Sequence, residues 1–163
     1  MFLMAALAHA DPENFMVSGF TFVRPPQWKW VWDERLANTG LRLRIEGSNT
    51  NDTAAVYFRS FTGEEGSPEN RIKVWQQFFK ESPDKVKIRT KMENVAGYPV
   101  IYLEMEGTSA LETTPEFGLF AAIVKMKQGH LVVRMSRSKK VVNNSKTLFK
   151  EMVENALKEK QLD

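Results

Sequence analysis

The sequence predicts an α+β fold in which an antiparallel β-sheet of about six to seven strands packs with two main α-helices. Several segments alternate apolar and polar residues with a period of two, and short turns join them in pairs, which is typical of antiparallel hairpins. Two other segments carry apolar residues at helical spacing on one side only, so each helix would bury one stripe against the sheet. The 163 residues, 42% of them hydrophobic and 26% charged, suit a single folded domain.

The first strands are predicted at residues 17–23, 41–46 and 54–61. In the first of them Phe20 and Phe22 share one face. The second alternates leucine and isoleucine with charged residues, so one of its faces is buried and the other solvated. Glycine, serine, asparagine and aspartate between residues 47 and 52 predict the turn to the third strand.

A helix is predicted to begin after Ser67, which suits the N-cap, with Pro68 at the first helical position. A second helix is predicted over residues 145–158. The expected inward residues of the first helix are Ile72, Trp75, Phe78 and Phe79, and those of the second are Leu148, Phe149, Met152, Val153, Ala156 and Leu157.

Two hairpins are predicted between the helices. Residues 85–92 alternate cations with Val86, Ile88, Thr90 and Met92, and a turn at 94–97 leads into a strand over 98–106. Strands over 117–127 and 131–136 form the other hairpin, closed by Gln128 and Gly129. The complete order is that of a two- or three-layer sandwich.

The first ten residues resemble the end of a secretory signal peptide. An apolar run from Met1 leads to Ala8-His9-Ala10, and charge and proline follow at once in Asp11-Pro12. Small residues at these positions are typical of a signal peptidase site, so cleavage is expected after Ala10. The run is too short to span a bilayer, which takes about 20 residues. We therefore expect residues 1–10 to be a signal peptide remnant and residues 11–163 to be a single exported domain, periplasmic or secreted; a buried N-terminal strand is the alternative.

The chain resembles PsbP/Mog-like domains in three short stretches. They are the strand, prolines and tryptophan of Gly19-Phe-Thr-Phe-Val-Arg-Pro-Pro-Gln-Trp28, the hairpin start Val95-Ala-Gly97-Tyr-Pro-Val-Ile-Tyr102, and the strand Gly129-His-Leu-Val-Val-Arg-Met-Ser136. The resemblance implies an α/β sandwich for residues 11–163 and a tendency to bind proteins, since most members of this superfamily are not enzymes. It assigns no functional residue.

No motif in the sequence indicates catalysis, a cofactor or a metal. Cysteine is absent, and the one histidine after the leader, His130, is expected to be exposed at a hairpin turn. Glu104 and Glu106 share a predicted strand face. They are more simply interpreted as acids on a solvated strand edge than as the carboxylate pair of a hydrolase. We therefore expect no catalytic residue, no metal site and no cofactor.

Two surfaces are candidates for binding. If residues 28–32 are extended, Trp28, Trp30 and Trp32 lie on one face, either as core or as an aromatic binding groove. The other candidate is a basic strand face formed by Lys85, Lys87, Arg89 and Lys91, which would suit an acidic partner unless acids on neighbouring strands neutralise it.

These observations favour a small exported protein that binds another envelope protein or an anionic surface and catalyses nothing. The net charge of +3 is too mild and too dispersed to indicate nucleic acid, and no segment is long enough to span a membrane. The alternatives are an apolar-ligand or lipid carrier with a pocket between sheet and helix, and a carboxylate-based hydrolase or sugar-binding protein that uses the tryptophans.

Overall fold

The computed structural model describes residues 11–49, 51–110 and 116–162. The expected signal peptide, residues 1–10, lies outside the described residues. The strands are β1 (Asn14–Val17), β2 (Phe20–Val23), β3 (Lys29–Trp30), β4 (Leu41–Glu46), β5 (Thr53–Thr62), β6 (Lys87–Val95), β7 (Tyr98–Gly107), β8 (Phe117–Met126) and β9 (Gly129–Ser138). The helices are α1 (Pro68–Trp75), α2 (Lys139–Leu162) and the 3-10 turns η1 (Glu34–Thr39), η2 (Gln76–Phe78) and η3 (Pro83–Lys85).

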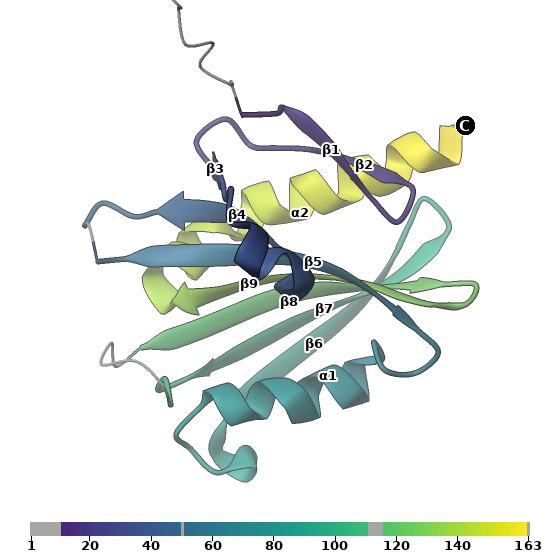
Figure 1. The fold of residues 1–163 in the computed structure, drawn as a ribbon. Helices are drawn as coiled ribbons and strands as arrows, with labels where there is room; N and C mark the ends of the chain where they lie inside the picture. The colour runs from purple at the N-terminus through teal and green to yellow at the C-terminus, as the bar shows by residue number, and fades with distance from the viewer. Residues whose placement is uncertain (1–10, 50, 111–115, 163) are drawn as a thin grey trace, which may run out of the picture.

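The predicted α+β class is confirmed, with an antiparallel sheet and two main helices. Seven strands pair in the order β3-β4-β5-β9-β8-β7-β6, and β1 pairs with β2 in a separate hairpin (Figure 1). The segment that contains α1 connects β5 to the far edge strand β6, and the chain then returns by hairpins to place β9 beside β5. Strands from the two halves of the sequence therefore meet at the β5–β9 pair.

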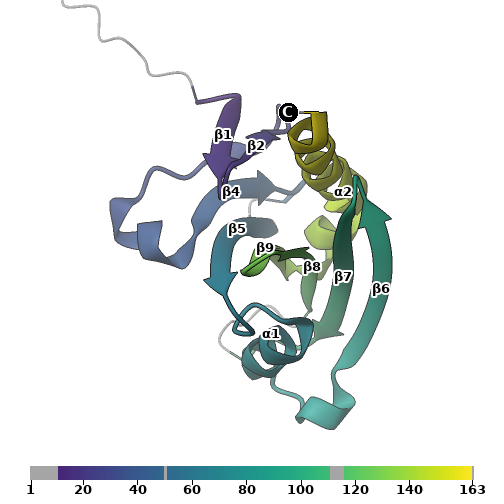
Figure 2. The ribbon, with the colours of Figure 1, turned by 90° about the vertical axis from the view of Figure 1, so that its right-hand side faces the viewer.

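The sheet is the middle of three layers. Helix α2 and the β1–β2 hairpin cover one face, and α1 covers the other (Figure 2). Each interface has its own apolar cluster: Phe22, Leu43 and Phe149 belong to the cluster under α2, whereas Trp75 and Leu119 belong to the cluster under α1. The helices are amphipathic, as expected from their spacing of apolar residues, and each buries its stripe on a different face of the sheet.

The single first strand predicted over residues 17–23 is wrong, because a hairpin turn lies inside it. Ser18 and Gly19 have φ angles of 54° and 80°, the left-handed conformation of a two-residue turn between β1 and β2. Phe20 and Phe22 nevertheless share a buried face, as the alternation predicts.

The start of α1 is confirmed at the predicted cap. The Ser67 hydroxyl accepts a hydrogen bond from the Asn70 amide, and Pro68 is the first helical residue. Helix α2 begins at Lys139, earlier than the predicted residue 145, because β9 leads into it directly. Leu148, expected to face inward, is 44% exposed. Neither helix in the described part of the chain has the apolar length that a bilayer crossing needs.

Candidate functional site

The three candidate tryptophans do not share one face. Trp28 is 3% exposed and lies in the core, Trp30 is half-buried, and Trp32 is 67% exposed. The expected aromatic row fails because β3 spans only Lys29–Trp30, and Trp28 precedes it in a turn where its amide donates to the Pro25 carbonyl. The Arg24 guanidinium secures this turn by donating to the Trp28 carbonyl oxygen at 2.5 Å.

Half-buried Trp30 and exposed Trp32 form the remainder of the predicted cluster. Their ring centres are 5.6 Å apart, and Trp30 packs edge to face on Phe15 at 5.1 Å. The Trp32 indole N–H donates to a carboxylate oxygen of Asp11 at 2.9 Å. The two rings form a small aromatic patch at the sheet edge. The predicted groove needed Trp28 as a third ring, and Trp28 is buried in the core.

The basic strand face is present only in part, and acids pair with two of its cations, Arg89 and Lys91. Lys85 ends the η3 turn and is not in a strand, whereas Lys87, Arg89 and Lys91 project from the edge strand β6. Arg89 lies 3.3 Å from Glu104 and 3.8 Å from Glu106, its neighbours on β7, and Lys91 lies 3.1 Å from Glu93. Cross-strand acids therefore reduce the positive potential that the sequence pattern alone suggested.

The same acids fasten helix α2 to the sheet. Lys146 contacts Glu104, Lys139 lies 3.6 Å from Glu106, and Lys150 lies 3.5 Å from Glu93. Because cations surround Glu104 and Glu106, these two carboxylates serve a structural contact between α2 and the β6–β7 pair.

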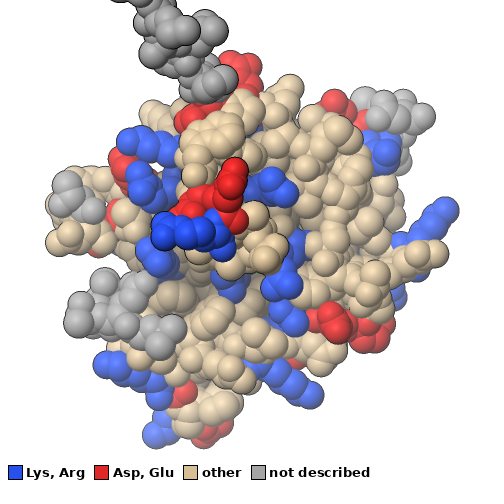
Figure 3. Space-filling view, in the orientation of Figure 1, with Lys and Arg blue, Asp and Glu red and all other residues tan. Residues whose placement is uncertain are grey.

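A separate cavity of about 170 Å³ lies on the opposite face, where α1 approaches β5 and β9. Its aromatic walls are Tyr57, Phe61, Trp75 and Phe78, and its polar groups include Arg59, Arg71 and Arg134. No Asp or Glu lines it among the described residues. Figure 3 shows Lys and Arg side chains along this face in the band between η1 and α1.

Arg134 is the deepest cation of the cavity. Its guanidinium lies 4.1 Å from the centre of the Tyr57 ring and 4.9 Å from that of Phe78. Its Nε is buried and has no hydrogen-bond partner within the described protein. The pKa of Arg134 is lowered to about 10, chiefly because burial removes its hydration; the Tyr57 hydroxyl opposes this shift, and the nearby charges of Arg59 and Arg71 contribute to it.

Arg71 and Arg59 complete the cluster around one aromatic ring. Their guanidinium carbons lie 4.3 Å and 4.7 Å from the centre of Phe61. Burial lowers the pKa of Arg71, and the charge of Arg59 is the next largest cause. The Nε of Arg71 donates a hydrogen bond to the Glu65 carbonyl oxygen at 2.8 Å. None of the three arginines forms an ion pair with a carboxylate of the described residues, and Glu65 acts on Arg71 only as a weaker nearby charge, so the cluster keeps a net positive charge suited to an anion.

The strand period of β5 and its pairing with β9 together position the cluster. Tyr57, Arg59 and Phe61 alternate along β5 and therefore share a face, and β9 pairs Arg134 directly with Tyr57. The sequence predicts β5 and β9 as strands, but nothing in either segment shows that the two strands are neighbours. The alternation of arginine with aromatics on β5 was the available signal.

Gly40 closes the cavity edge next to Thr39. Its φ of 79° is left-handed, and an added Cβ would lie 2.5 Å from the Phe58 carbonyl oxygen, so η1 contacts β5 only because this residue is glycine. The Gly40 carbonyl in turn accepts from the Phe58 amide at 2.8 Å.

His130 is buried, which corrects the expectation of an exposed turn residue. It is 7% exposed, and its Nδ1 lies 3.1 Å from the Gly63 carbonyl oxygen, beside the loop before α1. Across residues 11–49, 51–110 and 116–162, no group of His, Asp and Glu side chains is arranged to hold a metal ion.

Comparison with known proteins finds similarity in structure but not in sequence. No protein-family model matches the chain, and no curated protein matches its sequence significantly. The solution structure of cyanobacterial PsbP (CyanoP) from Synechocystis sp. PCC 6803 superposes with a TM-score of 0.52 at 14% identity, covering 86% of this chain and 88% of that one. A protein of unknown function from Pseudomonas aeruginosa, PA94, gives a TM-score of 0.49 at 8% identity, covering 86% of this chain and 92% of that one. The chain thus has a PsbP-like fold, as its sequence resemblance implied.

Proposed function

We propose that this chain is an exported, non-catalytic binding module that holds an acidic group of a partner protein in the arginine cavity. The observation that carries the proposal is the convergence of Arg59, Arg71 and Arg134 on a cavity that no described carboxylate lines. Folding such a cluster is unfavourable because like charges are brought together in a partly dry site. A bound anion would remove that cost.

The size and walls of the cavity favour a side-chain-sized group. A volume of about 170 Å³ is below the range of about 300–1,000 Å³ typical of sites that enclose a whole small molecule. Planar guanidinium groups bind carboxylates with paired hydrogen bonds, and arginine is enriched among residues that dominate protein interfaces. Arg59 is exposed at the rim, where an approaching partner would meet it first.

The proposal of export rests on the leader-like residues 1–10, and the proposed accessory role rests on the fold and on the sequence resemblance. The basic face of β6 contributes less than the cavity in this proposal, because Glu93, Glu104 and Glu106 already pair with it.

The test compares an acidic peptide with its neutral counterpart. Fluorescence anisotropy would measure binding of a labelled peptide rich in Glu and of the same peptide with Gln, at low salt and at about 150 mM salt. The expected result is binding of the Glu peptide alone, weakened at least tenfold, or about 1.4 kcal/mol, by the double change Arg59→Gln and Arg71→Gln. Arg35→Gln is the matched control, because its side chain is 89% exposed on η1 and pairs only locally with Asp33.

Two outcomes would reject the proposal. Equal affinity of the double variant and the Arg35→Gln protein would show that the cavity is not the binding site. Binding of inorganic phosphate or succinate with no binding of any acidic peptide would assign the cavity to a free small anion instead of a partner protein.

A further inference from the structure

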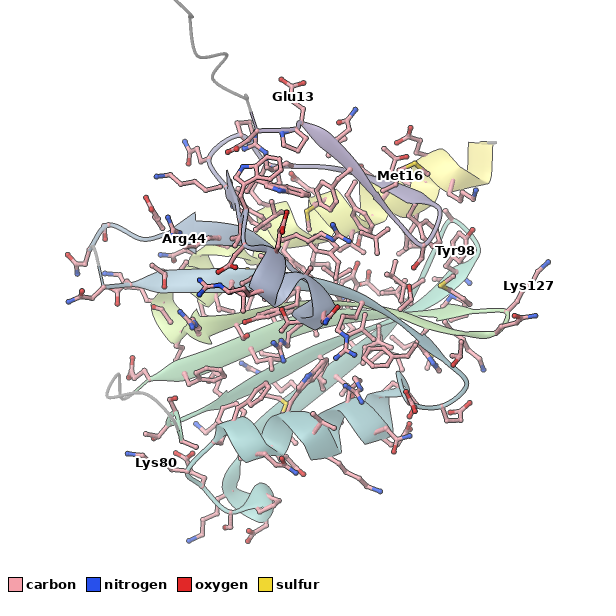
Figure 4. All side chains as sticks on the ribbon, in the orientation of Figure 1. Glu13, Met16, Arg44, Lys80, Tyr98 and Lys127 are labelled. Atoms are coloured by element: carbon pink, nitrogen blue, oxygen red, sulfur yellow. The ribbon has the colours of Figure 1, made fainter. Side chains whose placement is uncertain are left out.

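A second and larger cavity, of about 540 Å³, lies at the end of the molecule where several turns converge. The β1–β2 turn, the end of β5, the β8–β9 tip, the start of β7 and the end of α2 border it. Figure 4 shows Tyr98 and Lys127 on this same side of the molecule, carried by the β6–β7 and β8–β9 hairpins. Its volume lies within the range of about 300–1,000 Å³ usual for small-molecule sites.

The walls of this cavity are largely apolar. Phe20, Phe61, Tyr98 and Met126 line it, and the rings of Phe20 and Tyr98 meet edge to face at 5.5 Å. Tyr98 and Met126 pack against the apolar cluster under α2, so the cavity continues the main core outward. An apolar ligand would therefore exchange water for contacts with side chains that the fold already holds in place.

The charges at this cavity are positive. Lys127 and Lys160 line it, neither makes an ion pair with a described residue, and no described Asp or Glu lies in the lining. Lys160 reaches from α2 to the β1–β2 turn, where its Nζ is 3.9 Å from the position that a Cβ on Gly19 would occupy. A ligand with an anionic end would find unpaired cations beside the apolar walls.

We infer that this cavity binds an amphipathic anion, an apolar chain or ring that ends in a carboxylate or phosphate. The apolar part lies against Phe20, Tyr98 and Met126, and the anionic end pairs with Lys160 or Lys127. The site is independent of the arginine cavity, because it packs on the α2 side of the sheet, whereas Trp75 and Phe78 of the arginine cavity pack on the α1 side. Phe61 borders both cavities and is for that reason left unchanged in the tests.

Dodecanoate is the probe, with dodecanol and dodecyltrimethylammonium as neutral and cationic counterparts, all below their micelle concentrations. Isothermal titration calorimetry should detect dodecanoate binding that is at least tenfold tighter than binding of either counterpart. The double change Lys127→Gln and Lys160→Gln should weaken dodecanoate at least fivefold, and Lys73→Gln, an exposed lysine on α1, should leave the affinity unchanged. Met126→Trp should block the cavity and abolish binding.

A measurement on the unaltered chain keeps the inference falsifiable if Met126→Trp does not fold. With ¹³C-methyl methionine, the Met126 methyl signal should shift on titration with dodecanoate, while the signal of Met92, 72% exposed on β6, should not. The inference is overturned if Met126 does not shift, if dodecanol binds as tightly as dodecanoate, or if the double lysine variant retains full affinity.

Discussion

Tyr57 and Arg134 face each other across the β5–β9 ladder, and the guanidinium of Arg134 lies 4.1 Å from the centre of the Tyr57 ring. The aromatic face partly replaces the water that Arg134 loses on burial, which is a cation–π contact. It does not supply a counter-charge. The pair thus holds a buried cation at the base of the cavity.

Arg134→Met is expected to raise the free energy of unfolding by about 1 kcal/mol, although it should abolish binding of acidic peptides. The change removes a buried Nε without a hydrogen-bond partner and the repulsion from Arg59 and Arg71, and methionine fills similar space. Urea titration would measure the free energy of unfolding. Arg35→Met is the control, and its free energy of unfolding should lie within about 0.5 kcal/mol of that of the unaltered chain. A loss above 1 kcal/mol would mean that the contacts with Tyr57 and Phe78 outweigh the repulsion.

Trp28→Ala and Trp32→Ala are expected to differ strongly in stability. Trp28 is buried in the main core, so its loss should cost about 3–5 kcal/mol, whereas exposed Trp32 should cost about 1 kcal/mol or less. Chemical denaturation of both variants would compare them directly. Equal losses would contradict the burial that separates the two rings.

Gly40→Ala is expected to lower the stability of the chain and also to weaken the binding of acidic peptides to the arginine cavity. A left-handed φ costs a residue with a Cβ about 1–2 kcal/mol, and displacement from the Phe58 carbonyl adds to that. Thermal unfolding would measure the first effect and peptide anisotropy the second. Gly63→Ala is the matched control: its φ of 60° is also left-handed, but an added Cβ there meets nothing within 4 Å. A loss equal to that of Gly63→Ala would show that the contact between η1 and β5 does not require glycine.

Glu81 should make part of the stability pH-dependent in acid. Both of its carboxylate oxygens accept from the Thr108 amide, at 2.9 Å and 3.0 Å, and this backbone hydrogen bond is the largest cause of its lowered pKa. A carboxyl whose pKa is lower in the folded chain stabilises above its unfolded pKa, and that contribution is lost as the pH falls through the folded pKa. The stability difference between the unaltered chain and Glu81→Gln should therefore be largest near neutral pH and shrink towards about pH 2. A difference that stays constant in urea titrations across this range would contradict the assignment.

Local patterns were sufficient for most of the elements. The alternation in residues 41–46 and 54–61 and the Ser67-Pro68 start describe interactions within a few residues, and each of these elements lies where it was expected. The turn predicted at Gln128–Gly129 lies one residue earlier, at Lys127–Gln128, because Gly129 already begins β9. The turn at Ser18–Gly19 is a local feature that the prediction missed, whereas the burial of individual side chains depends on neighbours in space. Leu148 belongs to the apolar pattern of α2, but its side chain stays largely exposed because it lies outside the helix face that packs on the core.

The candidate sites depended far more on tertiary structure. A strand period predicted that Lys87, Arg89 and Lys91 share a face, but only the β6–β7 register shows that Glu104 and Glu106 lie beside Arg89. Similarly, nothing between residues 28 and 32 indicates that Trp28 enters the core at a turn while Trp32 stays at the surface.

By itself the sequence determined the α+β class, the hairpins, the helix start at Ser67 and the resemblance to PsbP-like domains, because periodicity and capping depend on residues close in the chain. Only the tertiary structure decided that Arg59, Arg71 and Arg134 meet in one cavity and that Arg89 of β6 lies beside acids of β7. The physical reason is that charge compensation and burial are set by contacts between segments distant in sequence. The pairing of β5 with β9, across more than seventy residues, brings those segments together.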